Sequence, residues 1–392
     1  MRRAFGLMVL ATMFGACAPA EPEVGVSSAA IISGEDSPSG AEDAVVLLVH
    51  ATRSEVGACS ATLVAPNLLL TALHCVAEMK DEGSVCDDKG KALYGGRIGK
   101  LHDATDMYVF VGNERPSFRG GRSEPDGRGA RIFAPETDVI CNSDIALIEL
   151  EAPITSMPIA ALRLDAPVVA DETITSVGWG VTTRTPSPQT RQRRTEVPVI
   201  AVGPTAKRGL EAAEGEFVVG ESICQGDSGG PAFSTDTGAI LGVVSRGGNG
   251  QQGSSPSAGC TGQNAVNLYT GVAAHRDMIL AAFEEVGAAP WLEGELNPIL
   301  GKFGEACENG EQCQQGVCVE TKKGAGTTCN LDCADDACPS GYTCATQGGD
   351  KVCVAKDDED EGGCAVGGRG AAAAWWLALG ELILLRRSRA VG

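Results

Sequence analysis

Apolar runs separated by glycine-rich and polar stretches organise this chain of 392 residues. One apolar run covers 61–70, and a second, from Ile145 to Leu150, is a strand opened by an aspartate, Asp144. The pattern from Val272 to Val286 is typical of an amphipathic helix. Glycine is abundant (52 residues) and aromatic residues make up only 4% of the chain. Together these patterns favour a turn-rich β protein with a helix near its end.

Residues 1–16 have the pattern of an export signal. Arg2 and Arg3 precede an apolar run, 4–16, that is too short to span a membrane. The small residues before Cys17 resemble a bacterial lipoprotein cleavage site. We expect residues 17–30 to be a lipobox and propeptide with a lipid on Cys17. Ordinary cleavage at Ala16 or Ala18 is the alternative.

A cysteine-rich segment lies between two linkers near the end of the chain. Residues 294–306 read as the first linker, and residues 307–353 contain eight cysteines with few apolar residues between them. So small a segment cannot be stabilised by burial alone, and exported thiols usually oxidise, so four disulfides are expected. The connectivity stays open. Zinc is the alternative, although no histidine lies in this segment.

The C-terminal tail combines a cysteine, an apolar stretch and a basic cluster. Acidic residues at 354–363 form a solvated linker. The tail, 364–392, resembles the three-part sorting signals of myxobacterial surface proteins: Cys364, then the stretch 371–385, then arginines. Glu381 interrupts the stretch, which makes it marginal as a lasting membrane helix. A sorting signal cleaved near Cys364 is expected, with a plain membrane helix as the alternative.

The segment from Cys224 to Pro231 carries the strongest chemical pattern. Its glycines allow positive φ and a sharp turn. Such a turn can direct the N–H groups of Gly226 and Ser228 at one point, where a carbonyl oxygen gains negative charge. Ser228 presents its hydroxyl there as a nucleophile. A serine is weak without a base, so the interpretation requires a histidine and a carboxylate elsewhere.

One histidine and one aspartate fit those roles. His74, one of four histidines, follows the apolar run 61–70 and precedes Cys75. Asp144 opens a strand, which suits a partly buried group that holds an imidazole in one tautomer. The remaining histidines have a structural or solvated interpretation; they are His50, His102 and His275.

The segments that contain His74, Asp144 and Ser228 occur in the order His, Asp, Ser. With this order, the chain resembles the trypsin/chymotrypsin-like serine proteases over 31–293. The resemblance implies an all-β fold: two six-stranded antiparallel β-barrels with a C-terminal helix, followed here by the disulfide-rich module. It implies that His74 is the general base, Asp144 orients it and Ser228 attacks. It also implies the disulfides Cys59–Cys75 and Cys224–Cys260. Cys86 and Cys141 then remain, and we infer that they pair with each other.

Activation in the family uses a new N-terminus. Ile31 resembles that start, so its amino group is expected to pair with Asp227 and order the oxyanion hole. The preceding residue, Ala30, departs from the Arg or Lys of trypsin-activated zymogens, which leaves the activating protease open.

Substrate choice depends on the pocket that the resemblance assigns. Ser222 stands where trypsins have aspartate, so the pocket lacks the charge that pairs with Arg or Lys. In the wall segment Ser245-Arg246-Gly247, Arg246 replaces an aromatic residue that usually covers the bound peptide. Asn267 stands where glycine is common and is expected to narrow the pocket. We therefore expect an uncharged residue, small or medium-sized, in this pocket.

The spacing from His74 to Asp144 is longer than in compact members, and the excess lies in 77–130. Its glycine-rich part, 113–129, is interpreted as a mobile loop, with an extended substrate site as the alternative.

The net charge of −20 argues against nucleic acid or an anionic membrane surface as partner. A monomeric serine endopeptidase is expected that is exported to the bacterial surface or released after processing, acts on protein or peptide substrates, and needs no cofactor or metal. Membrane association would come through the Cys17 lipid or the tail. The alternatives are a catalytically silent homologue that acts as a surface binding protein, and a functional cysteine-rich module with the protease as its regulator.

Overall fold

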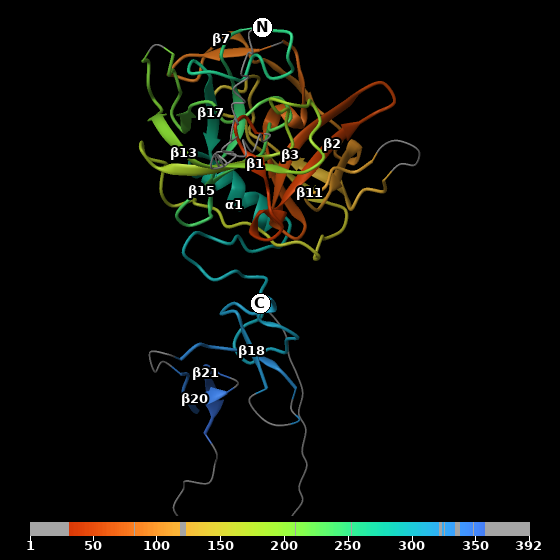
Figure 1. The fold of residues 1–392 in the computed structure, drawn as a ribbon. Helices are drawn as coiled ribbons and strands as arrows, with labels where there is room; N and C mark the ends of the chain where they lie inside the picture. The colour runs from red at the N-terminus through yellow and green to blue at the C-terminus, as the bar shows by residue number, and fades with distance from the viewer. Residues whose placement is uncertain are drawn as a thin grey trace, which may run out of the picture. The chain divides into compact units, whose positions relative to one another are not determined.

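The computed structural model describes residues 31–356, except 82, 118–122, 208, 252, 321–323, 325, 334–337 and 348. The chain divides into two compact units, Met1–Leu300 and Gly301–Gly392 (Figure 1). The predicted export signal, Cys17 and the 364–392 tail lie outside the described residues. Within the described residues, no helix has both the length and the apolar character needed to cross a membrane.

Six strands of the first unit close into an antiparallel barrel. The apolar run 61–70 folds into two strand segments, 61–65 and 68–70, which are joined by a turn at Pro66 and Asn67 and are buried on both faces. Leu69 packs inside this barrel with Val46 and Leu63, whereas Leu68 and Leu70 pack against the second barrel and the C-terminal helix. The strands, in barrel order, are β10 (Gly127–Phe133), β11 (Ala146–Leu150), β4 (Leu68–Thr71), β3 (Val56–Ala65), β2 (Val45–Ala51) and β9 (Met107–Phe110).

A second antiparallel barrel follows in the same unit, closed by the pairing of β13 with β14. Phe217 and Tyr269 stack in its core with ring centroids 5.1 Å apart. The short strand β1 (Glu35–Asp36) pairs with the outer side of β13. The barrel strands are β13 (Gln192–Val202), β12 (Thr173–Gly178), β15 (Pro231–Ser234), β16 (Ile240–Gly248), β17 (Val266–Gly271) and β14 (Glu216–Val219). The predicted fold class, two six-stranded antiparallel barrels, is confirmed.

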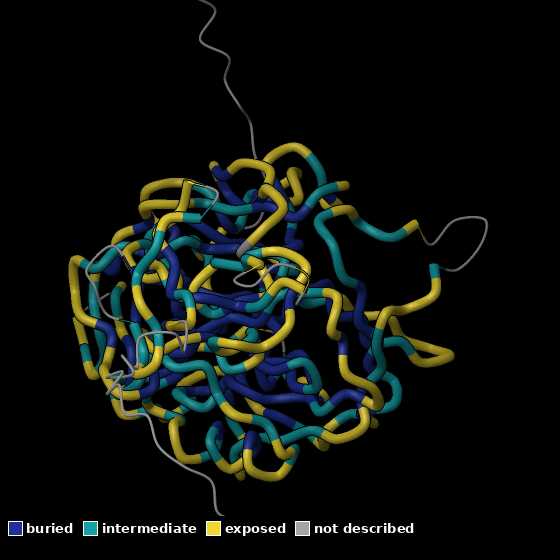
Figure 2. Tube along the Cα trace, turned by 90° about the horizontal axis from the view of Figure 1, so that it is seen from below, coloured by how far each residue is buried: buried dark blue, intermediate teal, exposed yellow. Residues whose placement is uncertain are grey.

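The helix predicted over 272–286 divides into two parts. A 3₁₀ turn, η4 (Val272–His275), leads into the α-helix α1 (Arg276–Glu285). Ile279 and Phe283 of α1 are buried against the first core cluster, which accounts for the amphipathic pattern. Figure 2 shows the buried segments at the centre of the unit and exposed chain at its edge.

The long stretch between His74 and Asp144 forms hairpins and short turns. β5 (Ala77–Met79) pairs with β8 (Ile98–Leu101), and β6 (Ser84–Cys86) pairs with β7 (Ala92–Gly95). The start of the 113–129 segment is bonded to the chain before β13, since the Arg115 N–H donates to the Gln189 carbonyl (2.6 Å). Three further 3₁₀ turns in this unit are η1 (Ala41–Ala44), η2 (Leu73–Cys75) and η3 (Ala104–Asp106).

The second unit is held by disulfides. It contains the turn η5 (Gly310–Gln312) and two small hairpins, β18 (Val317–Val319) with β19 (Thr328–Asn330) and β20 (Tyr342–Gln347) with β21 (Asp350–Ala355). The structure supplies the connectivity that the sequence left open: Cys307–Cys318, Cys313–Cys329, Cys333–Cys344 and Cys338–Cys353.

Candidate active site

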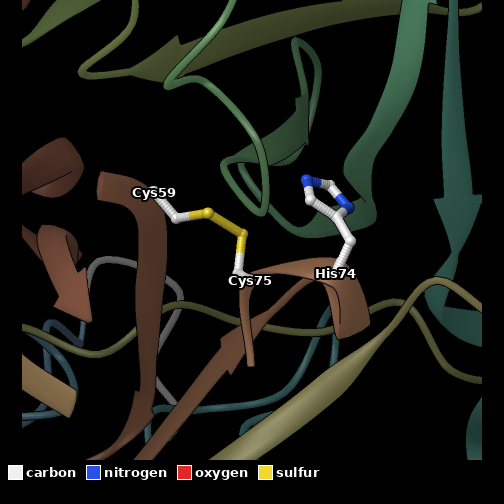
Figure 3. Close-up of side chains that lie close together, drawn as sticks. All are labelled: Cys59, His74 and Cys75. Atoms are coloured by element: carbon white, nitrogen blue, oxygen red, sulfur yellow. A yellow bond between two sulfur atoms is a disulfide. The ribbon is translucent and has the colours of Figure 1, made fainter. Parts of the chain in front are cut away.

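His74 lies on the short turn η2, directly after the buried strand β4. The next residue, Cys75, forms a disulfide with Cys59 of β3. Figure 3 shows the disulfide on one side of this turn and the imidazole of His74 pointing away from it. The turn is therefore fixed to the barrel while the ring is free to face other groups.

Asp144 contacts His74 twice, once at its backbone and once at its ring. Its Oδ1 accepts a hydrogen bond from the His74 backbone N–H (2.9 Å), and its Oδ2 lies 2.8 Å from His74 Nδ1. The Ser245 hydroxyl donates to the same Oδ2 (2.6 Å). Asp144 is fully buried, whereas the His74 side chain is 18% exposed. The pair fixes the tautomer with Nδ1 protonated and leaves Nε2 to accept a proton.

The two groups shift each other's pKa. Burial alone favours neutral His74, but the charge and hydrogen bond of Asp144 outweigh it and raise the His74 pKa above its usual value. Burial likewise favours neutral Asp144, yet the His74 charge and the hydrogen bonds from His74 and Ser245 lower its pKa. Asp144 is thus ionised at neutral pH, and His74 is a stronger base than a free imidazole.

The Ser228 turn is held between the two barrels. The Ser228 carbonyl accepts from the Ser60 N–H (2.8 Å), and the Gly229 N–H donates to the Val244 carbonyl (2.9 Å). A Cβ on Gly229 would lie 2.1 Å from Thr71 Oγ1, so this position needs glycine to approach the segment that leads to His74. In the described residues no hydrogen bond joins the His74 ring to the Ser228 hydroxyl; such bonds are often long before substrate binds.

Two backbone N–H groups of this turn have no backbone acceptor among the described residues. The neighbouring amides of Asp227 and Gly230 donate to the carbonyls of Cys224 and Asp227. In the described part of the chain, no backbone hydrogen bond is formed by the N–H of Gly226 or Ser228. Gly226 has φ of 95°, which favours glycine. The turn therefore presents the two amides that the sequence assigned to an oxyanion hole.

Asp227, next to the serine, is buried under the segment 178–180. Its Oδ1 accepts from the Gly180 N–H (2.7 Å) and its Oδ2 from the Cys224 N–H (2.9 Å). A Cβ on Gly180 would lie 2.5 Å from Asp227 Cγ, so the close approach requires glycine. Burial raises the pKa of Asp227 to about 7, against the effect of these bonds and of the Arg115 charge.

Arg115 contacts the same peptide group as Asp227. Its Nη2 donates to the Trp179 carbonyl (2.5 Å), while the N–H at the other end of that peptide, on Gly180, binds Asp227. The guanidinium also lies over the Trp179 ring, 5.6 Å from the centroid. The sequence analysis did not predict this contact, because Arg115 belongs to the stretch interpreted as a mobile loop.

Ile31 and Ile32, at the expected activation site, are both fully buried. Ile32 packs beside the Cys224–Cys260 disulfide. Ile31 has φ of 44°, an unfavourable value for a β-branched residue. In the intact chain the Ile31 nitrogen belongs to a peptide bond, so its ion pair with Asp227 stays a prediction that requires cleavage.

Asn267 controls the base of the cleft beside Ser228. The cleft has a volume of about 730 Å³, and its lining includes Ser228, Gly247 and Asn267. The Asn267 amide donates to the Gly220 carbonyl (2.7 Å) and lies 3.4 Å from Ser222 Oγ. The sequence analysis placed Ser222 at the base of the pocket, but Ser222 is fully buried. Asn267 therefore closes the base of the pocket instead. A Cβ on Gly247 would lie 2.2 Å from Asn267 Oδ1, so the amide also reaches the opposite wall.

Arg246 forms a buried ion pair that the sequence did not predict. Its two terminal nitrogens bind the carboxylate of Glu216 at 2.6 and 2.9 Å. The side chains are 10% and 0% exposed. Glu216 also accepts from the backbone N–H groups of Asn142 and Ala213. Glu216 opens an apolar strand and Asp144 lies two residues before one, and this similar pattern could have identified Glu216.

Among the described residues, the other cysteines and histidines have structural partners. The predicted Cys86–Cys141 pairing is present in the structure. His50 and His102 stack with centroids 3.8 Å apart, and His275 Nε2 lies 2.9 Å from the Asn142 carbonyl. Among the described residues, the cysteines close enough to share a metal with His74 form a disulfide, and disulfide sulfurs are not thiolate ligands.

Comparison with known proteins agrees with this geometry. The trypsin family model matches residues 31–279, more than half of the chain. A trypsin of Saccharopolyspora erythraea is 25% identical over 262 residues, which cover 64% of this chain and 96% of that protein. Trypsin alpha-3 of Lucilia cuprina is 31% identical over 156 residues, 37% of this chain and 86% of that protein. Phenoloxidase-activating factor 1 of Holotrichia diomphalia is 26% identical over 269 residues, 64% of each chain. The chain belongs to the trypsin family of serine proteases.

Proposed function

We propose that this protein is a serine endopeptidase that hydrolyses peptide bonds through an acyl-enzyme. Ser228 attacks the carbonyl carbon, and His74 takes the hydroxyl proton and later gives it to the leaving amine. Asp144 stabilises the imidazolium form of His74. The amides of Gly226 and Ser228 hold the negative oxygen of the tetrahedral intermediate. Water then releases the acyl group by the same steps in reverse order.

The arrangement around His74 and the Ser228 turn supports this proposal. A hydrogen-bonded series runs from Ser245 through Asp144 to His74, beside a turn with two unpaired amides. A silent homologue has no need to keep a buried carboxylate ionised or amide donors unpaired.

Labelling with a fluorophosphonate probe tests the proposal. The processed enzyme should become covalently modified at Ser228, and the Ser228→Ala variant should not. A processed, folded protein that resists the probe while a matched trypsin reacts would refute catalysis and favour the silent homologue.

We further propose that the residue before the cleaved bond is uncharged and small or medium-sized. Asn267 bridges the base and the wall of the pocket. Glu211 is the acidic residue among those lining the cleft, and it belongs to the segment after β13 rather than to the base. Cleavage of a peptide library should yield alanine-, serine- or valine-like residues at this position; a dominant preference for Arg or Lys would refute the proposal.

Cleavage before Ile31 is proposed as the activating step. Within the described residues, the carboxylate of Asp227 is bound by backbone N–H groups rather than by an ammonium group. Cutting the Ala30–Ile31 bond would create an ammonium partner and free the Ile31 backbone from its unfavourable φ. Ile31→Gly should weaken the activity of correctly cleaved enzyme, because the apolar side chain no longer anchors the new terminus. Full activity of that variant would refute the pairing.

We propose that the protein is exported, carries a lipid on Cys17 and is held at the bacterial surface through its C-terminal tail. Cleavage before Ile31 would separate the lipid from the protease, so retention would then depend on 364–392. Deletion of that tail should release processed enzyme into the medium; continued attachment to cells would contradict this route.

A further inference from the structure

The β6–β7 hairpin presents apolar side chains to solvent near the cleft. Val85 is 52% exposed, Tyr94 is 67% exposed and Leu93 is 61% exposed. Exposed apolar groups gathered on one small hairpin are a feature of interaction sites. Val85 and Tyr94 lie directly opposite each other across the two strands, so they share one face. The strand register shifts between Val85 and Cys86, so Leu93 is an extra residue at a bulge beside this pair.

The hairpin is held firmly to the catalytic scaffold. Cys86 forms a disulfide with Cys141, three residues before Asp144. Beyond the hairpin, the Gly96 N–H donates to the Gly83 carbonyl (3.0 Å), and the Ile140 N–H donates to the Gly96 carbonyl (2.9 Å). A site on this hairpin is therefore pre-organised, which reduces the entropy lost on binding. Figure 1 shows β7 at the outer edge of the unit.

The same hairpin forms part of the cleft that contains the nucleophile. Gly83, Val85 and Cys86 line it together with Ser228 and the pocket wall at Gly247. Tyr94 borders this lining, since a Cβ on Gly83 would lie 4.0 Å from its ring. The surface is thus continuous with the pocket for the residue before the cleaved bond. A peptide that continues from this pocket along the wall would reach the hairpin.

The described wall of the pocket lacks an aromatic residue that could cover a bound peptide. Arg246 stands where the resemblance leads one to expect an aromatic residue, and its guanidinium is occupied by Glu216. The described residues that line the cleft include no aromatic side chain. An apolar substrate side chain would therefore find its large apolar partner on the hairpin rather than on the wall.

We propose that the Val85–Tyr94 pair is a substrate-recognition site for a large apolar side chain, such as leucine or phenylalanine, two to four residues before the cleaved bond. This inference rests on the proposed endopeptidase activity and concerns its specificity. The hydrophobic contact raises kcat/KM for such peptides and makes no contribution to the reaction of Ser228 itself.

The test compares the processed enzyme with Val85→Ser/Tyr94→Ser and with Val169→Ser as a matched control. Val169 is also an exposed apolar residue (55%), but it lies outside the hairpin and is not part of the cleft lining. Quenched fluorogenic peptides carry leucine, phenylalanine or serine at each of the three positions. The double variant should lower the leucine-to-serine ratio of kcat/KM about tenfold, while the Val169→Ser variant should keep the ratio of the unaltered enzyme.

Fluorophosphonate labelling separates failure of this inference from failure of the proposed function. No labelling of the unaltered enzyme would refute the endopeptidase itself. Normal labelling of all three proteins with an unchanged ratio would refute the recognition site alone. If the double variant does not fold, Tyr94→Ser, which alters one exposed side chain, gives the same comparison. Self-association that the double variant abolishes, with selectivity unchanged, would assign this face to a second copy and overturn the proposal.

Discussion

At the scale of single residues, the site depends on how Asp144 and His74 shift each other's pKa. Both side chains are largely buried, which favours their neutral forms. The charge and hydrogen bond of each partner outweigh this effect and favour the charged form of the other. The sequence identified both residues because catalysis needs those residue types in short, recognisable segments. It did not predict Glu216 or Arg115 as neighbours of the site, since their partners lie far away along the chain.

Asp144→Asn should lower kcat about 10⁴-fold. The amide can donate to Nδ1, which favours the wrong imidazole tautomer and removes the charge that stabilises the imidazolium. Steady-state kinetics on a cleavable peptide measure this, with Ser245→Ala as a milder control that keeps the carboxylate. A kcat within tenfold of the unaltered enzyme would contradict the assigned role of Asp144.

The pH dependence of kcat/KM should report the raised pKa of His74. Only the neutral ring accepts the proton of Ser228, so activity should be full at high pH and fall as pH drops through a midpoint above 6.5. In the Asp144→Asn variant the midpoint should move down, because burial then acts without the opposing charge. A midpoint at or below 6.5 in the unaltered enzyme would argue against the coupling.

At the scale of elements, long strands bring the two halves of the site together. The β14 strand contributes Glu216 and the β16 strand contributes both Ser245 and Arg246, so one short segment supports Asp144 and carries a buried ion pair. The loop between β12 and β13 and the loop that contains Arg115 meet at Trp179. These contacts depend on strand register, which local sequence patterns do not determine.

Glu216→Gln should lower the free energy of unfolding by about 3–5 kcal/mol, because it leaves the guanidinium of Arg246 buried without its counter-charge. Denaturant unfolding in a Ser228→Ala background, which prevents self-digestion, measures the change. Arg276→Gln breaks an exposed pair with Asp165 and should change it by less than about 1 kcal/mol. Equal effects of the two substitutions would mean that burial of the Glu216 pair is unimportant.

Asp227 should make the intact, uncleaved chain less stable as pH rises. Its folded pKa of about 7 lies above the ordinary value of 3.8, so the stabilising contribution is complete below about pH 4 and is lost as pH rises through 7. The melting temperature of the Ser228→Ala protein should therefore fall relative to Ser228→Ala/Asp227→Asn over this range. Parallel curves for the two proteins would show that burial does not raise the pKa of Asp227.

At the scale of the whole molecule, the two units are stabilised in different ways. The protease unit has several apolar clusters and three disulfides. The described part of 301–356 has one small cluster, and that cluster consists of cysteines. In the described part of the chain, each of the seven disulfides joins cysteines of the same unit.

Replacing Cys313 and Cys329 by serine should therefore unfold the second unit while the protease unit keeps its activity. Limited proteolysis should cut the variant after residue 300 within minutes, whereas the unaltered protein resists. The rate of fluorophosphonate labelling should stay the same in both proteins. A loss of labelling would show that the protease depends on the cysteine-rich unit, as a regulatory role for one of them requires.

Local sequence patterns were sufficient to predict the family, the fold class and the residues of the proposed catalytic machinery. Those predictions rest on short segments, such as the Ser228 turn, in which backbone freedom and chemistry are local properties. The folded chain was needed to show that Asn267 rather than Ser222 closes the pocket, that Arg246 is bound by Glu216, and how the eight cysteines of 307–353 are paired. These outcomes join side chains that are far apart in the chain, so they depend on barrel closure and strand register rather than on any one segment.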